Sequence, residues 1–194
     1  MAYPSGMPAS QTAGESARYT WDDFIALDDE DKRELIDGEL VEIEVTAFMH
    51  EKAVSRLVQA LANWSDVHGG QALPSGYKVR VSSRNGVMPD VQFYRAGNEP
   101  GPDQDQGLVR GRSDLAVEVI SPSSRRYDRV KKLQWYAQLC VPEYWILDPE
   151  ARTLERLVLR DGAYVIAASF EGSDDTFRPE TFEGLEIPLA KLWG

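Results

Sequence analysis

The sequence predicts an α/β (α+β) fold built on a mixed central sheet, and three observations support this. Residues 115–120 are apolar on both faces except at Glu118, as expected for a strand buried in the middle of a sheet. A helical pattern at 125–139 and a second strand at 143–149 follow, and such a unit normally forms a right-handed crossover between parallel strands. Asp-Gly and Asn-Gly pairs between apolar runs predict additional hairpins.

Local patterns predict the other elements. A leader rich in Ser, Gly, Pro and Ala, residues 1–17, is expected to be disordered, and residues 18–194 are expected to form a single domain. Helices are expected where a capping box opens a turn or apolar residues recur at helical spacing: 22–27, 47–67 and 125–139. Strands are expected where short apolar runs meet turn residues: 34–36, 39–43, 75–81, 87–94, 143–149, 153–159 and 163–168. Residues 96–112 are predicted to be a loop, and the tail, 177–193, ends in a short amphipathic piece.

Composition narrows the class of protein. The chain has 194 residues, a formal net charge of −11 and one cysteine, Cys140, so no internal disulfide forms and a cytoplasmic location is expected. No apolar run is long enough to span a membrane, so no membrane partner is expected. The acidic balance argues against a broad positive footprint on DNA, although it leaves room for a local cationic site. Two histidines make a His-rich zinc site improbable.

Three features are candidates for one site. Asp90 follows Pro89 in an apolar strand, and Glu118 is an acid in a central strand, where an isolated charge costs several kcal/mol. On the following helix, Asp128, Lys132 and Tyr136 are spaced four apart and share a face. Two acids and a lysine suit metal-dependent hydrolysis of a phosphodiester, because Mg²⁺ is often held by one or two carboxylates, waters and substrate phosphate.

These residues carry a family resemblance. The segments around Pro89-Asp90, 117–124, 128–132 and 143–149 resemble the Uma-type family of restriction endonucleases, which belongs to the PD-(D/E)xK nuclease superfamily. The opening segment 34–40 and His50 also match, so that the resemblance covers roughly residues 19–164. It implies a restriction-endonuclease-like fold, a mixed central sheet flanked by helices, and a DNA substrate.

The resemblance also implies roles for single residues. Mg²⁺ or Mn²⁺ is expected at Asp90 and Glu118, with Glu34 as an additional acid, and His50 and Tyr136 are further candidates. Ile120 stands where the plain form of the superfamily has its lysine, and the family pattern instead supplies Lys132 from the next helix. Lys131 is its neighbour, but a helix turns it about 100° away. Cys140 stands where the family usually has glycine.

Each candidate has a structural alternative. Glu118 could belong to a buried ion pair, and Lys132 could form a surface pair with Asp128. Tyr136 and His50 could be packed core residues, with His50 lying on the apolar stripe of its helix. Glu34 could be an ordinary acid before a hairpin.

Three functions remain open at this point. A metal-dependent endonuclease requires Asp90, Glu118 and Lys132 to lie within a few ångströms of one another beside a groove. By analogy, such an enzyme is expected to be a homodimer, because two sites would be needed to cut both strands at once. A catalytically silent DNA- or protein-binding module on the same fold requires no metal. A glycoside hydrolase could use Asp90 and Glu118, but it would leave Lys132 without a role.

Overall fold

The computed structural model describes residues 18–28, 31–42, 47–74, 76–99, 108–109, 112–120 and 127–193. The predicted leader, 1–17, lies outside the described residues. The strands within these ranges form three sheets, whose strand orders are β11-β10-β9-β8-β6-β3, β2-β1-β5-β4-β7 and β12-β13. The larger sheet contains β3 (Gln71–Pro74), β6 (Val91–Tyr94), β8 (Leu115–Val119), β9 (Glu143–Asp148), β10 (Thr153–Arg160) and β11 (Ala163–Glu171).

The second sheet lies next to the first and contains β1 (Arg33–Ile36), β2 (Glu39–Glu42), β4 (Lys78–Arg80), β5 (Gly86–Val87) and β7 (Leu108–Val109). The third sheet consists of two strands, β12 (Thr176–Phe177) and β13 (Ile187–Pro188). The helices are α1 (Trp21–Ile25), α2 (Phe48–His68), a π-helical turn η2 (Asp128–Lys132), α4 (Leu133–Gln138) and α5 (Leu189–Trp193). None of the helices in these ranges combines the length and apolar character needed to span a bilayer.

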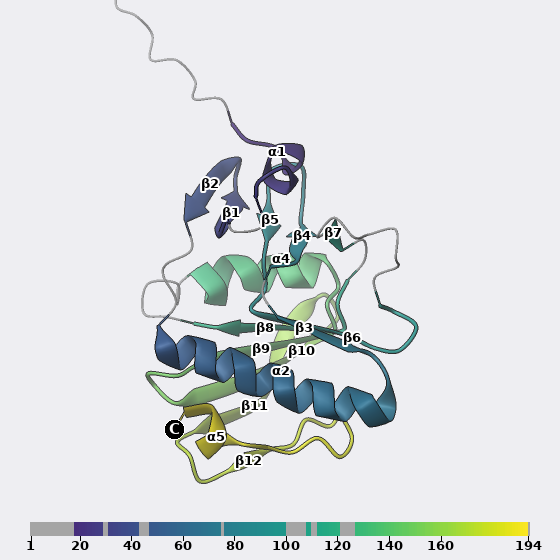
Figure 1. Ribbon diagram of the computed structural model, residues 1–194, viewed down its shortest axis with the longest axis vertical. Helices are drawn as coiled ribbons and strands as arrows, with labels where there is room; N and C mark the ends of the chain where they lie inside the picture. Colours follow the sequence, from purple (N-terminus) through teal and green to yellow (C-terminus); the bar gives the residue numbers. More distant parts are fainter. Residues whose placement is uncertain are drawn as a thin grey trace, which may run out of the picture.

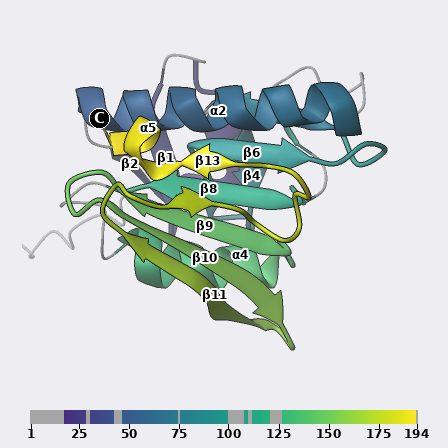
Figure 2. The same cartoon turned by 90° about the horizontal axis from the view of Figure 1, so that it is seen from below.

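The central strand β8 makes the large sheet mixed, as predicted. It pairs antiparallel with β6 and parallel with β9, and the connection between β8 and β9 passes through η2 and α4. All five residues of β8 are buried, because helices cover both faces of the sheet: α2 and α5 lie on one side and α4 on the other (Figures 1 and 2). The sheet therefore has two cores, and Glu118 must lie in one of them.

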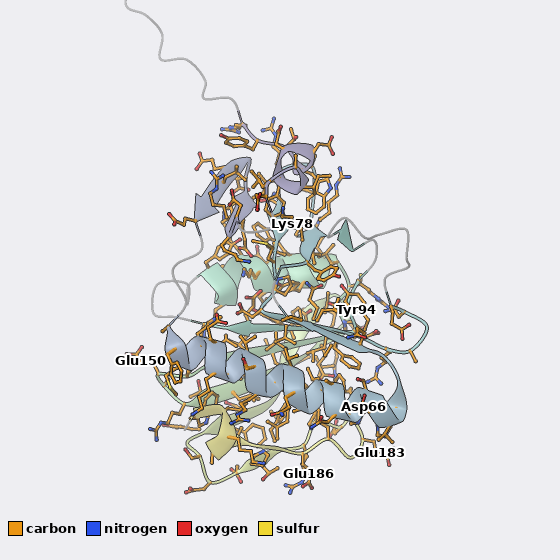
Figure 3. All side chains as sticks on the ribbon, viewed as in Figure 1. Asp66, Lys78, Tyr94, Glu150, Glu183 and Glu186 are labelled. Carbon is orange, nitrogen blue, oxygen red and sulfur yellow. The ribbon has the colours of Figure 1, made fainter. Side chains whose placement is uncertain are left out.

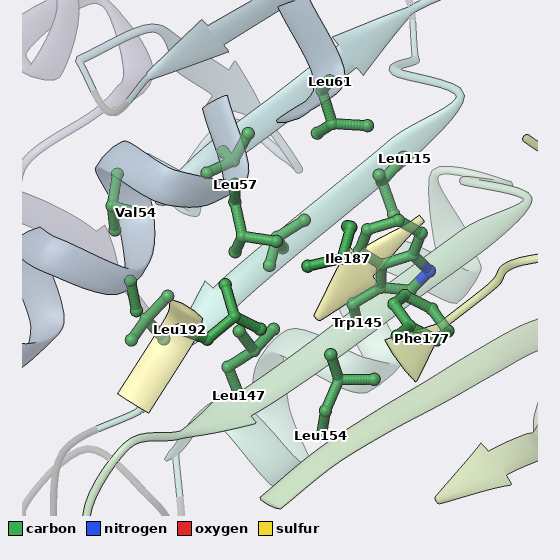
Figure 4. Packing of buried hydrophobic residues seen from close by; sticks show 14 of the residues in the cluster. Val54, Leu57, Leu61, Leu115, Trp145, Leu147, Leu154, Phe177, Ile187 and Leu192 are labelled. Carbon is green, nitrogen blue, oxygen red and sulfur yellow. The ribbon is translucent and has the colours of Figure 1, made fainter. Parts of the chain in front are cut away.

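The core under α2 holds the odd-numbered residues of β8. Leu115, Val117 and Val119 pack there against the apolar stripe of α2 and the C-terminal segment, including Leu57 and Leu192 (Figure 4). The other core contains Ala116 and Ile120, with Tyr136 of α4 and Tyr144 of β9. Glu118 has the same parity as Ala116 and Ile120, so the strand directs its carboxylate toward α4.

Helix α1 packs on the smaller sheet. The predicted capping box is present, with Thr20 and Asp23 bonding each other's backbone amides, and Trp21 and Phe24 are buried on the sheet. A Cβ on Gly86 would come within 2.8 Å of the Phe24 ring, which explains why glycine stands where α1 crosses β5. Lys78 of β4, labelled in Figure 3, donates from Nζ to the Leu27 carbonyl at 3.1 Å and so joins β4 to the turn that follows α1.

Some predicted strands are divided differently. The expected strand 75–81 is β4 alone, and β3 precedes it at 71–74, because a turn around Gly76 (φ 124°) separates them. The expected strand 87–94 is split between sheets: β5 pairs with β4 and β1, whereas β6 pairs with β8 and β3. The chain changes sheet at 88–90, next to Pro89, which cannot donate to a ladder. The short strands β7, β12 and β13 were not predicted.

The helix after β8 departs from regular α geometry. Its first turn, Asp128–Lys132, is π-helical, with one more residue per hydrogen-bonded loop than an α-helix. Val130, an apolar residue of the predicted helix 125–139, is 51% exposed, whereas the charged Lys132 is 4% exposed. The π-helical geometry of this turn therefore directs Lys132, rather than Val130, toward the protein interior.

Candidate functional site

A lysine lies between two buried carboxylates. Lys132 Nζ is 3.0 Å from Glu118 Oε2 and 3.1 Å from Glu34 Oε1, and each of the three side chains is at most 5% exposed. Glu34 comes from β1 of the small sheet, Glu118 from β8 of the large sheet, and Lys132 from the π-helical turn between them. Three elements distant in sequence thus meet at one charged cluster.

Backbone and hydroxyl donors fix the two carboxylates. The Tyr136 hydroxyl donates to Glu118 Oε1, and the Met88 amide donates to Glu34 Oε1 at 2.9 Å. Burial, followed by the charge of Glu118, raises the pKa of Tyr136 well above its ordinary value of 10.0, so the hydroxyl stays protonated and acts as a donor. Tyr136 is buried, as the structural alternative expects, but it is also in direct contact with the candidate acid.

Asp90 lies at the entry to β6, next to the end of β8. Its Oδ2 accepts a hydrogen bond from the Val119 amide at 2.7 Å, one residue beyond Glu118. Its side chain is 17% exposed, more than Glu118 or Lys132. Asp90 is therefore the most accessible acid of the group and is anchored to the strand that carries Glu118.

His50 contacts Asp90 from the first turn of α2. Its Nε2 lies 3.3 Å from Asp90 Oδ2, and its Nδ1 lies 3.3 Å from Glu51 Oε1 without hydrogen-bond geometry. Burial alone would lower the pKa of His50, but the hydrogen bond and charge of Asp90 outweigh burial and raise it. The side-chain contacts therefore form two groups: one of Glu34, Glu118, Lys132 and Tyr136, and one of Asp90 with His50, which is linked to β8 through the Val119 amide.

Lys131 joins neither group. Its Nζ pairs with Asp37 Oδ2 at 2.7 Å on the surface, where the two side chains are 44% and 67% exposed. Asp37 occupies the β1–β2 turn in the left-handed region (φ 52°). The two adjacent lysines thus contact the same hairpin, Lys131 at its exposed turn and Lys132 at the buried Glu34. Of the two, Lys132 is the one that contacts the buried carboxylates.

Sequence reasoning missed one residue beside the cluster. The Tyr127 hydroxyl is buried, and it has no hydrogen-bond partner among the described residues. The Tyr127 ring centroid lies 5.5 Å from Lys132 Nζ, and burial, followed by the charge of Glu34, raises the pKa of Tyr127. Positions five residues apart are not neighbours on the surface of a regular α-helix, so no sequence pattern indicated that Tyr127 would lie beside Lys132.

The donor set suits a hard cation. Carboxylate oxygens are the ligands that Mg²⁺ and Mn²⁺ prefer, and Asp90 is hydrogen-bonded to the Val119 amide, one residue beyond Glu118. Within the described ranges, no three His, Cys, Asp or Glu side chains form a complete ligand cluster. Asp90 and Glu118 could supply two carboxylates, and Mg²⁺ is often held by one or two carboxylates plus waters and substrate phosphate.

The cavities lie elsewhere. One of about 630 Å³ is lined by α2 and the C-terminal segment, and a second lies along the first half of α2. Neither of these two cavities is lined by Asp90, Glu118 or Lys132. Packing explains this at the charged cluster, whose side chains are almost fully buried.

A mixed sheet flanked by helices, with acids and a lysine gathered at its central strand, is the arrangement of a restriction-endonuclease-like nuclease fold. The chain belongs to the Uma2 family, described as "Putative restriction endonuclease", which it matches over residues 21–190. This confirms the predicted family and fold class.

A solved structure supports the fold independently. The crystal structure of "a putative nuclease belonging to DUF820" from Anabaena variabilis ATCC 29413 is similar with a TM-score of 0.73 at 15% identity. The similarity covers 90% of this chain and 97% of that chain. No curated protein matches the sequence significantly. Both descriptions name a nuclease, and at this identity the structural likeness shows the fold.

Proposed function

We propose that the protein is a metal-dependent endonuclease that hydrolyses phosphodiester bonds in DNA. The observation that carries the proposal is the position of Lys132, which lies between Glu34 and Glu118 beside the strand to which Asp90 is anchored. A buried ion pair adds little net stability, so a structural role alone gives the fold little reason to keep a lysine there.

In this proposal Asp90 and Glu118 hold Mg²⁺ or Mn²⁺. When bound, the metal would lower the pKa of a water and neutralise charge on the phosphate. Tyr136 holds one oxygen of Glu118 by donating to it, and His50 and the Val119 amide hold Oδ2 of Asp90. The accessible acid and the buried acid are thus both oriented before a metal arrives.

Lys132 supplies the fixed positive charge. Its ammonium orients the attacking water or stabilises the charge that develops on the phosphate. Glu34, predicted as an additional metal acid, contacts Lys132 and the Met88 amide, so we assign it chiefly to positioning the lysine.

A plasmid-nicking assay with Mg²⁺, Mn²⁺ or chelator tests this function. Wild type should cut only with metal, and Glu118→Ala, Lys132→Ala and Asp90→Asn should each lose cutting by about a hundredfold or more. Lys131→Ala, which removes the neighbouring surface lysine, should cut like wild type. Circular dichroism identifies variants that fail to fold, and Asp90→Asn is the mildest because its side chain is partly exposed.

Metal-independent cutting, or full activity in Lys132→Ala, would contradict the proposal. The second candidate is a catalytically silent DNA- or protein-binding module, which is favoured by the double engagement of Lys132 and the absence of a three-ligand cluster among the described residues. Calorimetric titration with Mn²⁺ separates the two: the nuclease binds metal through Asp90 and Glu118, and the module does not.

A further inference from the structure

One buried hydroxyl beside the charged cluster takes no part in the contacts described above. The Tyr127 hydroxyl is buried and has no hydrogen-bond partner among the described residues. A buried hydroxyl without a partner costs free energy that a phenylalanine ring at the same position would not cost. The packing of the protein in this state therefore gives no reason for tyrosine rather than phenylalanine at position 127.

The ring of Tyr127 is held on two sides. Tyr127 immediately precedes the π-helical turn η2, and Lys132 is the last residue of that turn. The ring centroid lies 5.5 Å from Lys132 Nζ. On another side the Trp135 ring packs edge-on, with 5.8 Å between the ring centroids and 80° between the ring planes. Because the ring is held in this way, its hydroxyl has a defined position next to the ammonium of Lys132.

The electrostatic surroundings indicate which carboxylate the hydroxyl is near. Burial raises the pKa of Tyr127 most, and the charge of Glu34 raises it next; Lys132 lowers it to a smaller extent, and Glu118 has a still smaller effect. The hydroxyl therefore stays protonated near neutral pH and can donate a hydrogen bond. Of the two carboxylates that contact Lys132, Glu34 influences this hydroxyl more strongly.

The contacts of Lys132 restrict what it can do in the proposed reaction. Its Nζ lies 3.1 Å from Glu34 and 3.0 Å from Glu118, and its side chain is only 5% exposed. To contact a DNA phosphate, the ammonium has to move toward solvent, and this movement weakens at least one ion pair. Glu118 is the proposed metal ligand, so a lysine that acts near the metal stays close to Glu118 and moves away from Glu34. Taking the ammonium away from a buried carboxylate is costly unless another donor replaces it.

We propose that Tyr127 is a positioning residue that replaces Lys132 as the donor to Glu34 when the ammonium turns toward the DNA phosphate. The ion pair between Lys132 and Glu34 opens, a hydrogen bond from the Tyr127 hydroxyl to Glu34 forms, and no proton is transferred. The buried carboxylate thus keeps a donor in both arrangements. The inference rests on the proposed function for the event that moves Lys132, whereas the exchange of donors depends only on the cluster itself.

Tyr127→Phe keeps the ring and removes only the hydroxyl, so it tests the proposal in the plasmid-nicking assay. Turnover should fall about tenfold, and the DNA concentration that gives half the maximal rate should not change, because the hydroxyl acts only after Lys132 has moved. In a Glu34→Gln background the carboxylate charge is absent, so adding Tyr127→Phe should change turnover by less than about twofold. Equal turnover in Tyr127→Phe and wild type overturns the proposal, as does an equal loss in both backgrounds.

Urea unfolding tests the exchange of donors without DNA. Tyr127→Phe should not lower the stability of the wild type, because the hydroxyl makes no hydrogen bond there. In Lys132→Met the hydroxyl should donate to Glu34, so adding Tyr127→Phe should lower the folding equilibrium constant by about tenfold. Lys132→Gln replaces Lys132→Met if the methionine variant does not fold. Tyr136→Phe is the matched control: its hydroxyl already donates to Glu118, so its loss should lower stability in the wild type as well.

The two measurements separate this inference from the proposed function. An effect of Tyr127→Phe on stability that is equal with and without Lys132 overturns the exchange of donors, even if the protein cuts DNA. A wild type that cuts no DNA with Mg²⁺ or Mn²⁺ contradicts the nuclease function. The exchange is still supported in that case if Tyr127→Phe destabilises only the variant that lacks Lys132.

Discussion

Lys132 Nζ and Glu118 Oε2 lie 3.0 Å apart, and their side chains are 5% and 3% exposed. Glu34 approaches the same ammonium from the other sheet at 3.1 Å. Removing one partner of a buried pair leaves the other charge without compensation, which costs far more than the pair itself contributes. The cluster therefore makes the protein sensitive to changes that conserve volume but remove charge.

Lys132→Met should lower the free energy of unfolding by about 3–5 kcal/mol at neutral pH, because Glu34 and Glu118 remain buried without the ammonium. Lys131→Met is the control: its pair with Asp37 is exposed, so the change should cost less than about 1 kcal/mol. Urea unfolding measures both. Similar small losses in the two variants would show that the cluster is not tightly buried.

Tyr136→Phe should leave Glu118 Oε1 without its hydroxyl donor. An unsatisfied buried acceptor costs about 1–3 kcal/mol, and cutting should fall by about tenfold as Glu118 loses its orientation. Tyr164→Phe removes a hydroxyl that donates to the Val141 carbonyl at 2.8 Å, remote from the acids. That control should lose some stability and no activity. Equal nicking rates in Tyr136→Phe and wild type would remove Tyr136 from the site.

His50 should stabilise the metal-free protein more at low pH than at high pH. Its pKa in the folded chain is raised above the usual 6.5, so the contribution is fully present below about pH 6.5 and is lost as the pH rises through the folded value. His50→Gln should therefore destabilise the protein most on the acidic side, when unfolding is measured against pH in chelator. A stability difference that grows as the pH rises would contradict the sign.

Cys140→Gly should stabilise the protein by about 1 kcal/mol, because Cys140 holds the left-handed conformation (φ 58°) where the helix α4 ends. Cys140→Ala keeps a Cβ at the same position and should change stability little. Thermal unfolding of the three proteins compares them. No gain in the glycine variant would mean that the greater freedom of its unfolded chain offsets the relief of strain.

The sequence was sufficient where a local period or a turn decides the structure. Alternation in β8 correctly separated Val117 and Val119 from Glu118, and Asp-Gly correctly located the turns at Asp37 and Asp161. Helical spacing correctly gave α2 and its buried stripe. These features depend on neighbours within a few residues, so their signal is contained in short stretches of the chain.

The features that the sequence did not predict depend on irregular helix geometry and on contacts between residues distant in sequence. The π-helical turn leaves Val130 exposed and buries Lys132, and no residue pattern specifies its longer hydrogen-bonded loop. The contact between Glu34 and Lys132 joins residues almost a hundred positions apart, and the family resemblance indicated an acid at Glu34 without indicating that it would contact the lysine.

The position of Glu34 also affects the order in which the protein loses activity and unfolds on heating. Glu34 belongs to the small sheet, whereas Glu118 and the amide that holds Asp90 belong to the large one. If the small sheet detaches first, Lys132 loses one of its two anchors while the six-stranded sheet is still intact. Cutting should then be lost at a lower temperature than the main unfolding transition, and it should return on cooling as long as the larger core has not melted.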